Sequence, residues 1–223
     1  MQGLPHRRSA RERRRSWPNL ALLAPFVCLT ALTTAACRDR PAETPEDAYL
    51  LVLKACDKGD PAYLFDAFDT PTQWSIETVH HAQREMRQLV FETYPPEDKA
   101  RFLGRIPDAA EEEEDHARRY YRRLDGSQAL LGDLKKRIYA GSGQPVGSVD
   151  HRTKTATVWR EGGSIFHFAR DDKGRWGFSE LRSEWDHAKL RAIHDLETVR
   201  KNAALYRQLA GGPPADGATR STP

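Results

Sequence analysis

Residues 155–181 read TATVWREGGSIFHFARDDKGRWGFSEL, and this stretch decides the fold class. β-Branched and aromatic residues recur there in short runs, separated by two turns rich in glycine and aspartate. The predicted strands cover residues 155–159, 164–169 and 176–181, with an earlier strand near 146–151. The chain is therefore expected to hold an antiparallel β-meander over residues 146–182.

Upstream of the meander, apolar residues recur at helical spacing. Thr44 is expected to cap the first helix, with Pro45 at its first position and Gly59 at its end. Pro95 and Pro96 are expected to end the long third helix firmly. Helices are predicted over residues 44–59, 60–68, 72–94 and, with a less regular pattern and a break at Gly126, within 97–140.

Downstream of the meander, Ser183 is expected to cap a helix over residues 184–209. At about 1.5 Å per residue this helix would be near 40 Å long, more than a small sheet can cover. Its apolar stripe is a candidate face for a protein partner, with burial in the domain's own core as the alternative. The residues of this predicted partner face are Trp185, Ala192, Leu196, Val199 and Tyr206.

These patterns together predict an α+β domain over residues 44–210. Its N-terminal helices (44–140) are expected to pack on the short antiparallel β-meander (146–182), with the long C-terminal helix (184–209) following. The tail, residues 211–223, is rich in Gly, Pro, Ala and Thr and is predicted to be disordered.

The charge of the chain is unevenly distributed. The formal net charge is +3, from 35 Lys and Arg and 32 Asp and Glu. Residues 1–36 hold six of the bases and one of the acids, which leaves 29 bases, 31 acids and a net charge of −2 for the rest. The folded part therefore lacks the excess of basic residues that nucleic-acid binding requires, and no nucleic-acid partner is expected.

The N-terminal segment has the three parts of an export signal in order. A cationic region holds Arg7 to Arg15, and an apolar run extends from Leu20 to Leu32. That run is shorter than the roughly 20 apolar residues of a permanent membrane span. Small residues follow it up to Cys37. Residues 1–36 are therefore predicted to be a signal peptide.

Residues 32–37, LTTAAC, resemble the lipobox of bacterial prolipoproteins. The resemblance implies that the sulfur of Cys37 carries a diacylglyceryl group and that the peptide bond before it is cut. Thr34 departs from the aliphatic residue usual there. An ordinary cleaved signal and an uncleaved N-terminal anchor remain alternatives.

Lipidation would place the protein in the bacterial cell envelope, anchored to the inner or outer membrane and exposed outside the cytoplasm. Residues 37–43 would be the tether. Cys56, the cysteine left in the mature domain, lies on the apolar stripe of the first helix. It is interpreted as a small core residue, with a reactive thiol as the alternative.

Two stretches resemble the cone-shaped nuclear-transport-factor-two-like superfamily, to which many small bacterial lipoproteins look similar. They are residues 44–60 and residues 173–181. The resemblance implies a pocket between helices and a curved sheet, but no particular activity. The helices within 97–140 and the final helix depart from that family's pattern.

Four residues are candidates for lining such a pocket. Asp66 and Asp69 could share acid and base roles, with Trp74 near them in sequence. His167 lies between Phe166 and Phe168 in a strand, so it faces solvent if they face the core, or the pocket if that side is hollow. The alternative for the aspartates is an exposed helix end.

Other catalytic or ligand-binding patterns are lacking in the sequence. No Cys-x-x-Cys, His-Glu-x-x-His, nucleophile elbow or phosphate loop occurs, so neither a metal nor a cofactor is expected. The leading hypothesis is a non-enzymatic, membrane-anchored accessory or binding module. The alternatives are a hydrolase-like or isomerase-like enzyme with a cone pocket, or a periplasmic carrier of a small molecule.

Overall fold

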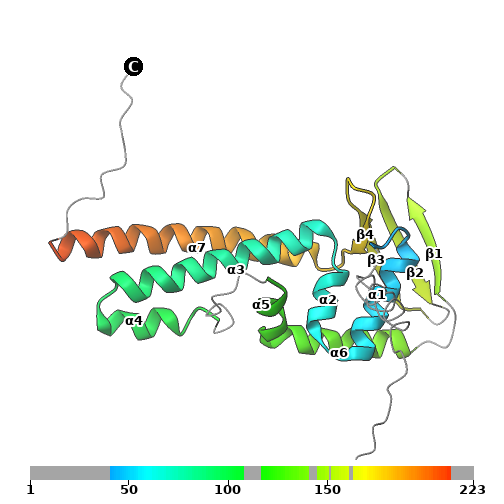
Figure 1. The fold of residues 1–223 in the computed structure, drawn as a ribbon, viewed down its shortest axis with the longest axis horizontal. Coiled ribbons are helices and arrows are strands. Elements are labelled where there is room, and N and C mark those ends of the chain that lie inside the picture. The colour runs from blue at the N-terminus through cyan, green and yellow to red at the C-terminus, as the bar shows by residue number, and fades with distance from the viewer. Residues whose placement is uncertain (1–40, 108–116, 141–144, 151, 161–162, 212–223) are drawn as a thin grey trace, which may run out of the picture. The chain divides into compact units, whose positions relative to one another are not determined.

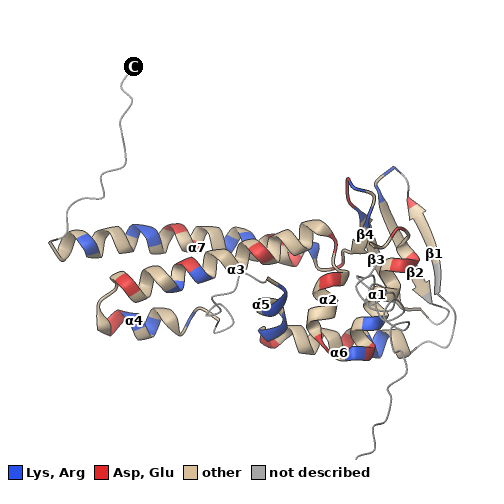
Figure 2. Cartoon of the chain, viewed as in Figure 1, with Lys and Arg blue, Asp and Glu red and all other residues tan. Residues whose placement is uncertain are grey.

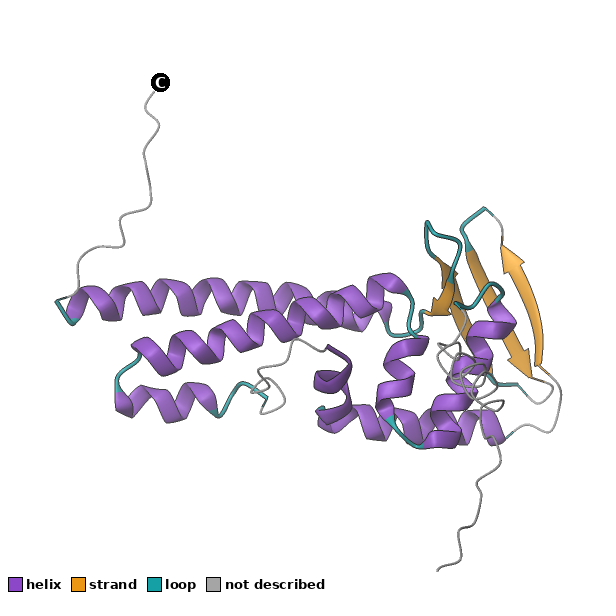
Figure 3. Cartoon of the chain, viewed as in Figure 1, coloured by secondary structure: helices purple, strands orange, loops and turns teal. Residues whose placement is uncertain are grey.

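The computed structural model describes residues 41–107, 117–140, 145–150, 152–160 and 163–211. The predicted signal peptide, Cys37 and all but the first residue of the predicted disordered tail lie outside these residues. The described part confirms the predicted α+β class, with helices, then a β-meander, then a long C-terminal helix (Figure 1; Figure 3).

The N-terminal helices are α1 (Pro45–Lys58), α2 (Pro61–Ala67), α3 (Thr70–Thr93), α4 (Pro96–Leu103), α5 (Ala117–Arg123) and α6 (Asp125–Tyr139). The strands are β1 (Pro145–Asp150), β2 (Thr155–Arg160), β3 (Ile165–Arg170) and β4 (Trp176–Phe178). The last helix is α7 (Arg182–Leu209).

The four strands form one antiparallel sheet in the order β1-β2-β3-β4. Alternation along the strands buries one face, because successive side chains point to opposite sides. The buried side chains on this face are those of Ala156, Val158, Phe166, Phe168, Trp176 and Phe178. Helix α1 covers this face and places the ring of Tyr49 5.3 Å from that of Phe166, centroid to centroid. The core thus lies between α1 and the sheet.

The starts of α1, α2 and α3 follow local capping chemistry. Thr44 and Asp47 form a reciprocal capping box on α1, as predicted, and Gly59 ends that helix with a left-handed φ of 64°. Asp60 caps α2 and Asp69 caps α3, each accepting a hydrogen bond from a backbone amide. Helix α3 therefore begins at Thr70, two residues before the predicted start.

Two other predicted helix boundaries differ from those in the structure. Helix α7 begins at Arg182, and its capping position is Leu181, which makes no side-chain cap; the expected cap at Ser183 is wrong. The break expected at Gly126 within residues 97–140 lies at Leu124, and Gly126 sits inside the first turn of α6.

Helices α3 and α7 lie side by side and run in the same direction (Figure 1). The order of their contacts shows this direction. Ser75 donates a hydrogen bond to Asp186 at 2.7 Å, Arg200 pairs with Glu85 at 2.7 Å, and the Tyr94 and Tyr206 rings lie 4.7 Å apart. A parallel pair is possible because the chain returns through the whole meander before α7 begins.

One junction joins the sheet to this helix pair. Phe68 bridges Phe178 of β4, and the amide of Asp69 donates to the Phe178 carbonyl at 3.1 Å. The buried Asp69 carboxylate also accepts from Arg182, with Nε at 3.0 Å. Residues at the starts of α3 and α7 are therefore fixed to each other and to β4.

The described chain is already packed at Ala42. This residue is buried, and its carbonyl accepts a hydrogen bond from the amide of Trp176 at 2.9 Å. The tether predicted to extend from Cys37 to residue 43 is shortened by this contact.

The interpretation of Cys56 as a core residue is confirmed. It is fully buried on α1, and burial raises the pKa of its thiol to about 11, with the charge of Asp57 adding to the rise. At neutral pH the thiol is therefore protonated and a poor nucleophile.

Gly177→Ala tests the contact between β4 and the start of α3. A Cβ at this position would lie 2.4 Å from the Asp69 Cα and 2.5 Å from its nitrogen, so backbone would have to move. We expect the free energy of unfolding, measured with urea, to fall by at least about 2 kcal/mol.

The matched control is Gly132→Ala in α6, where nothing lies within 4 Å of the added atom. Alanine is the better helix former there, so this variant should gain roughly 0.5–1 kcal/mol. Equal effects of the two substitutions would contradict the close contact at Gly177.

Candidate functional site

The four predicted pocket residues do not converge on one cavity. Asp69 is buried at the junction, while Asp66 lies on α2 in an ion pair with Arg118 at 2.9 Å. The side chain of Trp74 is 70% exposed on α3. These positions do not place two polar groups around a common space, which acid and base catalysis would need.

Asp69 has a structural role that its sequence context indicates. It caps α3 through the Thr72 amide at 2.9 Å and holds Arg182. The order Asp69-Thr70-Pro71 is typical of a helix start, because an acidic cap is followed by a proline near the first position. Asp69 does line a small cavity of about 80 Å³ beside Pro41 and Arg175, but its carboxylate is already taken by the cap and the ion pair.

His167 lies on the outer face of the sheet. Phe166 and Phe168 are fully buried, and the histidine between them is exposed. This is the arrangement expected when both phenylalanines face the core. Its backbone amide donates to Glu180 at 3.3 Å, and Glu180 in turn pairs with Arg137 at 2.7 Å. His167 lines none of the three cavities described in this subsection.

The predicted partner face of α7 is core. Ala192, Leu196 and Val199 are 4–8% exposed, and Trp185 and Tyr206 pack partly buried against the same core. Helix α3 covers this stripe. This packing is the alternative expected for the stripe, because the helix predicted over 72–94 is long enough to pair with α7, which the sheet is not. Binding of a protein partner by α7 stays a prediction.

The helix pair is not filled along its whole length. A cavity of about 470 Å³ opens between α3, α4 and α7. Its apolar lining includes Val79, Met86, Val90, Phe102, Ile106, Ala192 and Val199. Polar side chains at its edge are those of Gln83, Arg105, Arg191, Asp195 and Thr198. This volume and composition are within the range of small-molecule pockets.

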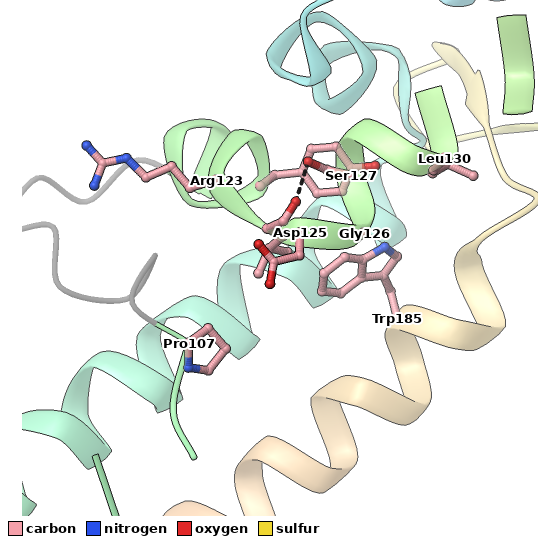
Figure 4. A pocket seen from close by; sticks show the side chains of 9 residues that line it. Pro107, Arg123, Asp125, Gly126, Ser127, Leu130 and Trp185 are labelled. Atoms are coloured by element: carbon pink, nitrogen blue, oxygen red, sulfur yellow. Dashed lines mark hydrogen bonds between the residues drawn. The ribbon is translucent and has the colours of Figure 1, made fainter. Parts of the chain in front are cut away.

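A second cavity, of about 490 Å³, lies between the turn from α5 to α6 and Trp185 of α7 (Figure 4). The indole of Trp185 lies beside Asp125 and Gly126, with Pro107 opposite, and the guanidinium of Arg123 points away from these residues. The hydroxyl of Ser127 donates to the carbonyl of Leu124 at 2.7 Å.

The polar groups of the second cavity are poorly arranged for catalysis. The Ser127 proton is engaged by a carbonyl, which is not a base. Tyr121 also lines the cavity, but its hydroxyl is buried away from water, and burial raises its pKa well above the usual value. It therefore stays protonated at neutral pH. The sequence indicated neither cavity, because residues 97–140 lack a clear pattern.

Figure 2 shows Lys and Arg concentrated on α5. Two of these arginines are paired: Arg118 with Asp66 of α2, and Arg122 with Asp60, the capping residue of α2, at 3.4 Å. Among the described residues no three His, Cys, Asp or Glu side chains lie close enough to hold a metal ion.

None of the helices in the described ranges combines the length and apolar character that a membrane span requires. Comparison of the chain with protein-family models, curated proteins and solved structures gives no match. The residues and their geometry are therefore the basis for any functional conclusion.

The pair Asp66 and Asp69 allows a matched test of the structural role of Asp69. Asp69→Ala removes both the cap of α3 and the partner of Arg182, so we expect a loss of about 2–3 kcal/mol in the free energy of unfolding. Asp66→Ala breaks an ion pair whose two side chains are each 44% exposed, so it should cost less than about 1 kcal/mol. Similar urea midpoints for the two variants would show that Asp69 does not hold the junction.

Leu196→Asp tests whether the α7 stripe is core. The buried carboxylate would lack a partner at the α3 seam, so the thermal midpoint should fall in line with a loss of at least about 3 kcal/mol. Leu190→Asp, on the 62% exposed side of the same helix, should cost under about 1 kcal/mol. A stable, fully folded Leu196→Asp protein would restore the partner-face interpretation.

Proposed function

We propose that this protein is an envelope lipoprotein, anchored through Cys37, whose α+β domain acts as a non-enzymatic accessory or binding module close to the membrane. The observation that supports it most directly is the short distance between the lipobox-like sequence and the folded domain. The described domain is already packed at Ala42, which is five residues after Cys37 in the sequence.

The length of this connection limits where the domain can be. Five residues span at most roughly 18 Å when fully extended. A domain tied so closely to a lipidated cysteine works at the membrane surface, which suits a subunit or binding module of an envelope assembly. Its specificity would come from the exposed faces of the sheet and helices, because the α7 stripe is covered by α3.

The resemblance to the nuclear-transport-factor-two-like superfamily belongs to this proposal. Its support is the order of α1, α2 and α3 before the meander, with α1 on the core face of the sheet. Helix α7 and the three helices α4 to α6 go beyond that family's pattern.

A second candidate is carriage of a small apolar molecule. The cavity between α3, α4 and α7 favours it, since its lining is mostly apolar and its volume suits a ligand. Enzymatic activity has less support, because the candidate acids and His167 lie on different surfaces.

Intact mass of the protein purified from its native envelope tests the anchor. We expect a mature chain that begins at Cys37 and carries the diacylglyceryl mass, and a Cys37→Ala variant that lacks this mass and leaves the membrane fraction. A mature chain without lipid, or one cut elsewhere, would contradict the proposal. A further small mass retained under native conditions would favour the carrier over the accessory module.

A further inference from the structure

The exposed indole of Trp74 lies near the point where the chain joins the domain. Pro41, Thr70, Gln73 and Arg175 line one small cavity, so Pro41 lies beside the first turn of α3. Thr70 and Trp74 are four residues apart and therefore share one face of α3. Helical side chains lean toward the helix N-terminus, so Trp74 leans toward this junction.

The exposed indole of Trp74 offers an apolar surface that another molecule could cover. Trp74 is 70% exposed, although tryptophan is among the largest apolar side chains. Its neighbours Pro41 and Pro71 are also exposed. An indole has an apolar body and one polar N–H, which suits the boundary between lipid and water, where tryptophan is enriched in membrane proteins.

Three of the four charged side chains in the adjoining β3–β4 turn (171–175) are already in ion pairs. Asp171 binds Arg175 at 2.8 Å and Lys154 binds Asp172 at 2.8 Å. Attraction to anionic lipid is therefore not the main contribution to a membrane contact here. The main contribution would come from the apolar side chains around Trp74.

We infer that the surface formed by Pro41, Pro71 and Trp74 docks on the lipid bilayer. This inference rests on the proposed anchor at Cys37. The tether of at most roughly 18 Å keeps the Ala42 side of the domain at the membrane. The exposed apolar residues at the far end of α3 and α7, Phe91 and Leu209, lie more than 20 residues along their helices from the junction. Trp74 fixes the orientation that the tether permits.

Fluorescence quenching in vesicles tests this orientation. The full-length lipidated protein is reconstituted in phosphatidylcholine vesicles whose acyl chains are brominated near the headgroup. After signal cleavage the chain holds Trp74, Trp159, Trp176 and Trp185. We expect bromolipid quenching in the wild type, loss of most of it in Trp74→Phe, and its retention in Trp159→Phe, the matched variant on the outer face of the sheet.

The mass of the same preparation separates the two levels of the proposal. Lipidated protein without quenching, or with quenching that Trp74→Phe leaves unchanged, overturns the docking surface but leaves the anchor. Protein without the diacylglyceryl mass overturns the anchor, and the docking inference with it.

Discussion

The buried carboxylate of Asp69 is the constraint on which the arrangement of the helices depends. It satisfies a free amide at the start of α3 and binds the guanidinium of Arg182 at the start of α7. Its backbone lies against Gly177, where a side chain would not fit. Because both long helices start from this one point beside β4, they run in parallel and in a fixed register.

The fixed register determines what the helix pair can do. Over most of their length the α3 and α7 side chains interlock, which buries the stripe from Trp185 to Tyr206. Where α4 folds back, small residues such as Ala188 and Ala192 leave the 470 Å³ cavity. The apolar stripe of α7 is therefore covered by α3, and a pocket lies beside it. Contact with other molecules would therefore fall to its outer surfaces, including the one proposed to dock on the membrane.

The sequence predicted what depends on neighbours along the chain. Thr44, Asp47 and Gly59 cap one helix, and the glycine turns and alternating aromatic residues set the meander, all within a few residues. The pairing of α3 with α7 joins residues more than 100 positions apart, and no local pattern encodes it. The same distance hid the role of Asp69, whose partner Arg182 comes 113 residues later. Both large cavities lie between α7 and helices far earlier in the chain, so no local sequence pattern could predict them.

Helix α3 of the same chain covers the apolar face of α7. Hydrogen–deuterium exchange of the isolated monomeric protein tests this packing, because amides of a packed helix exchange only when the packing opens. We expect residues 188–203 of α7 to exchange as slowly as residues 76–90 of α3. Rapid exchange over 188–203 in the isolated protein, slowed only when another protein is added, would contradict it.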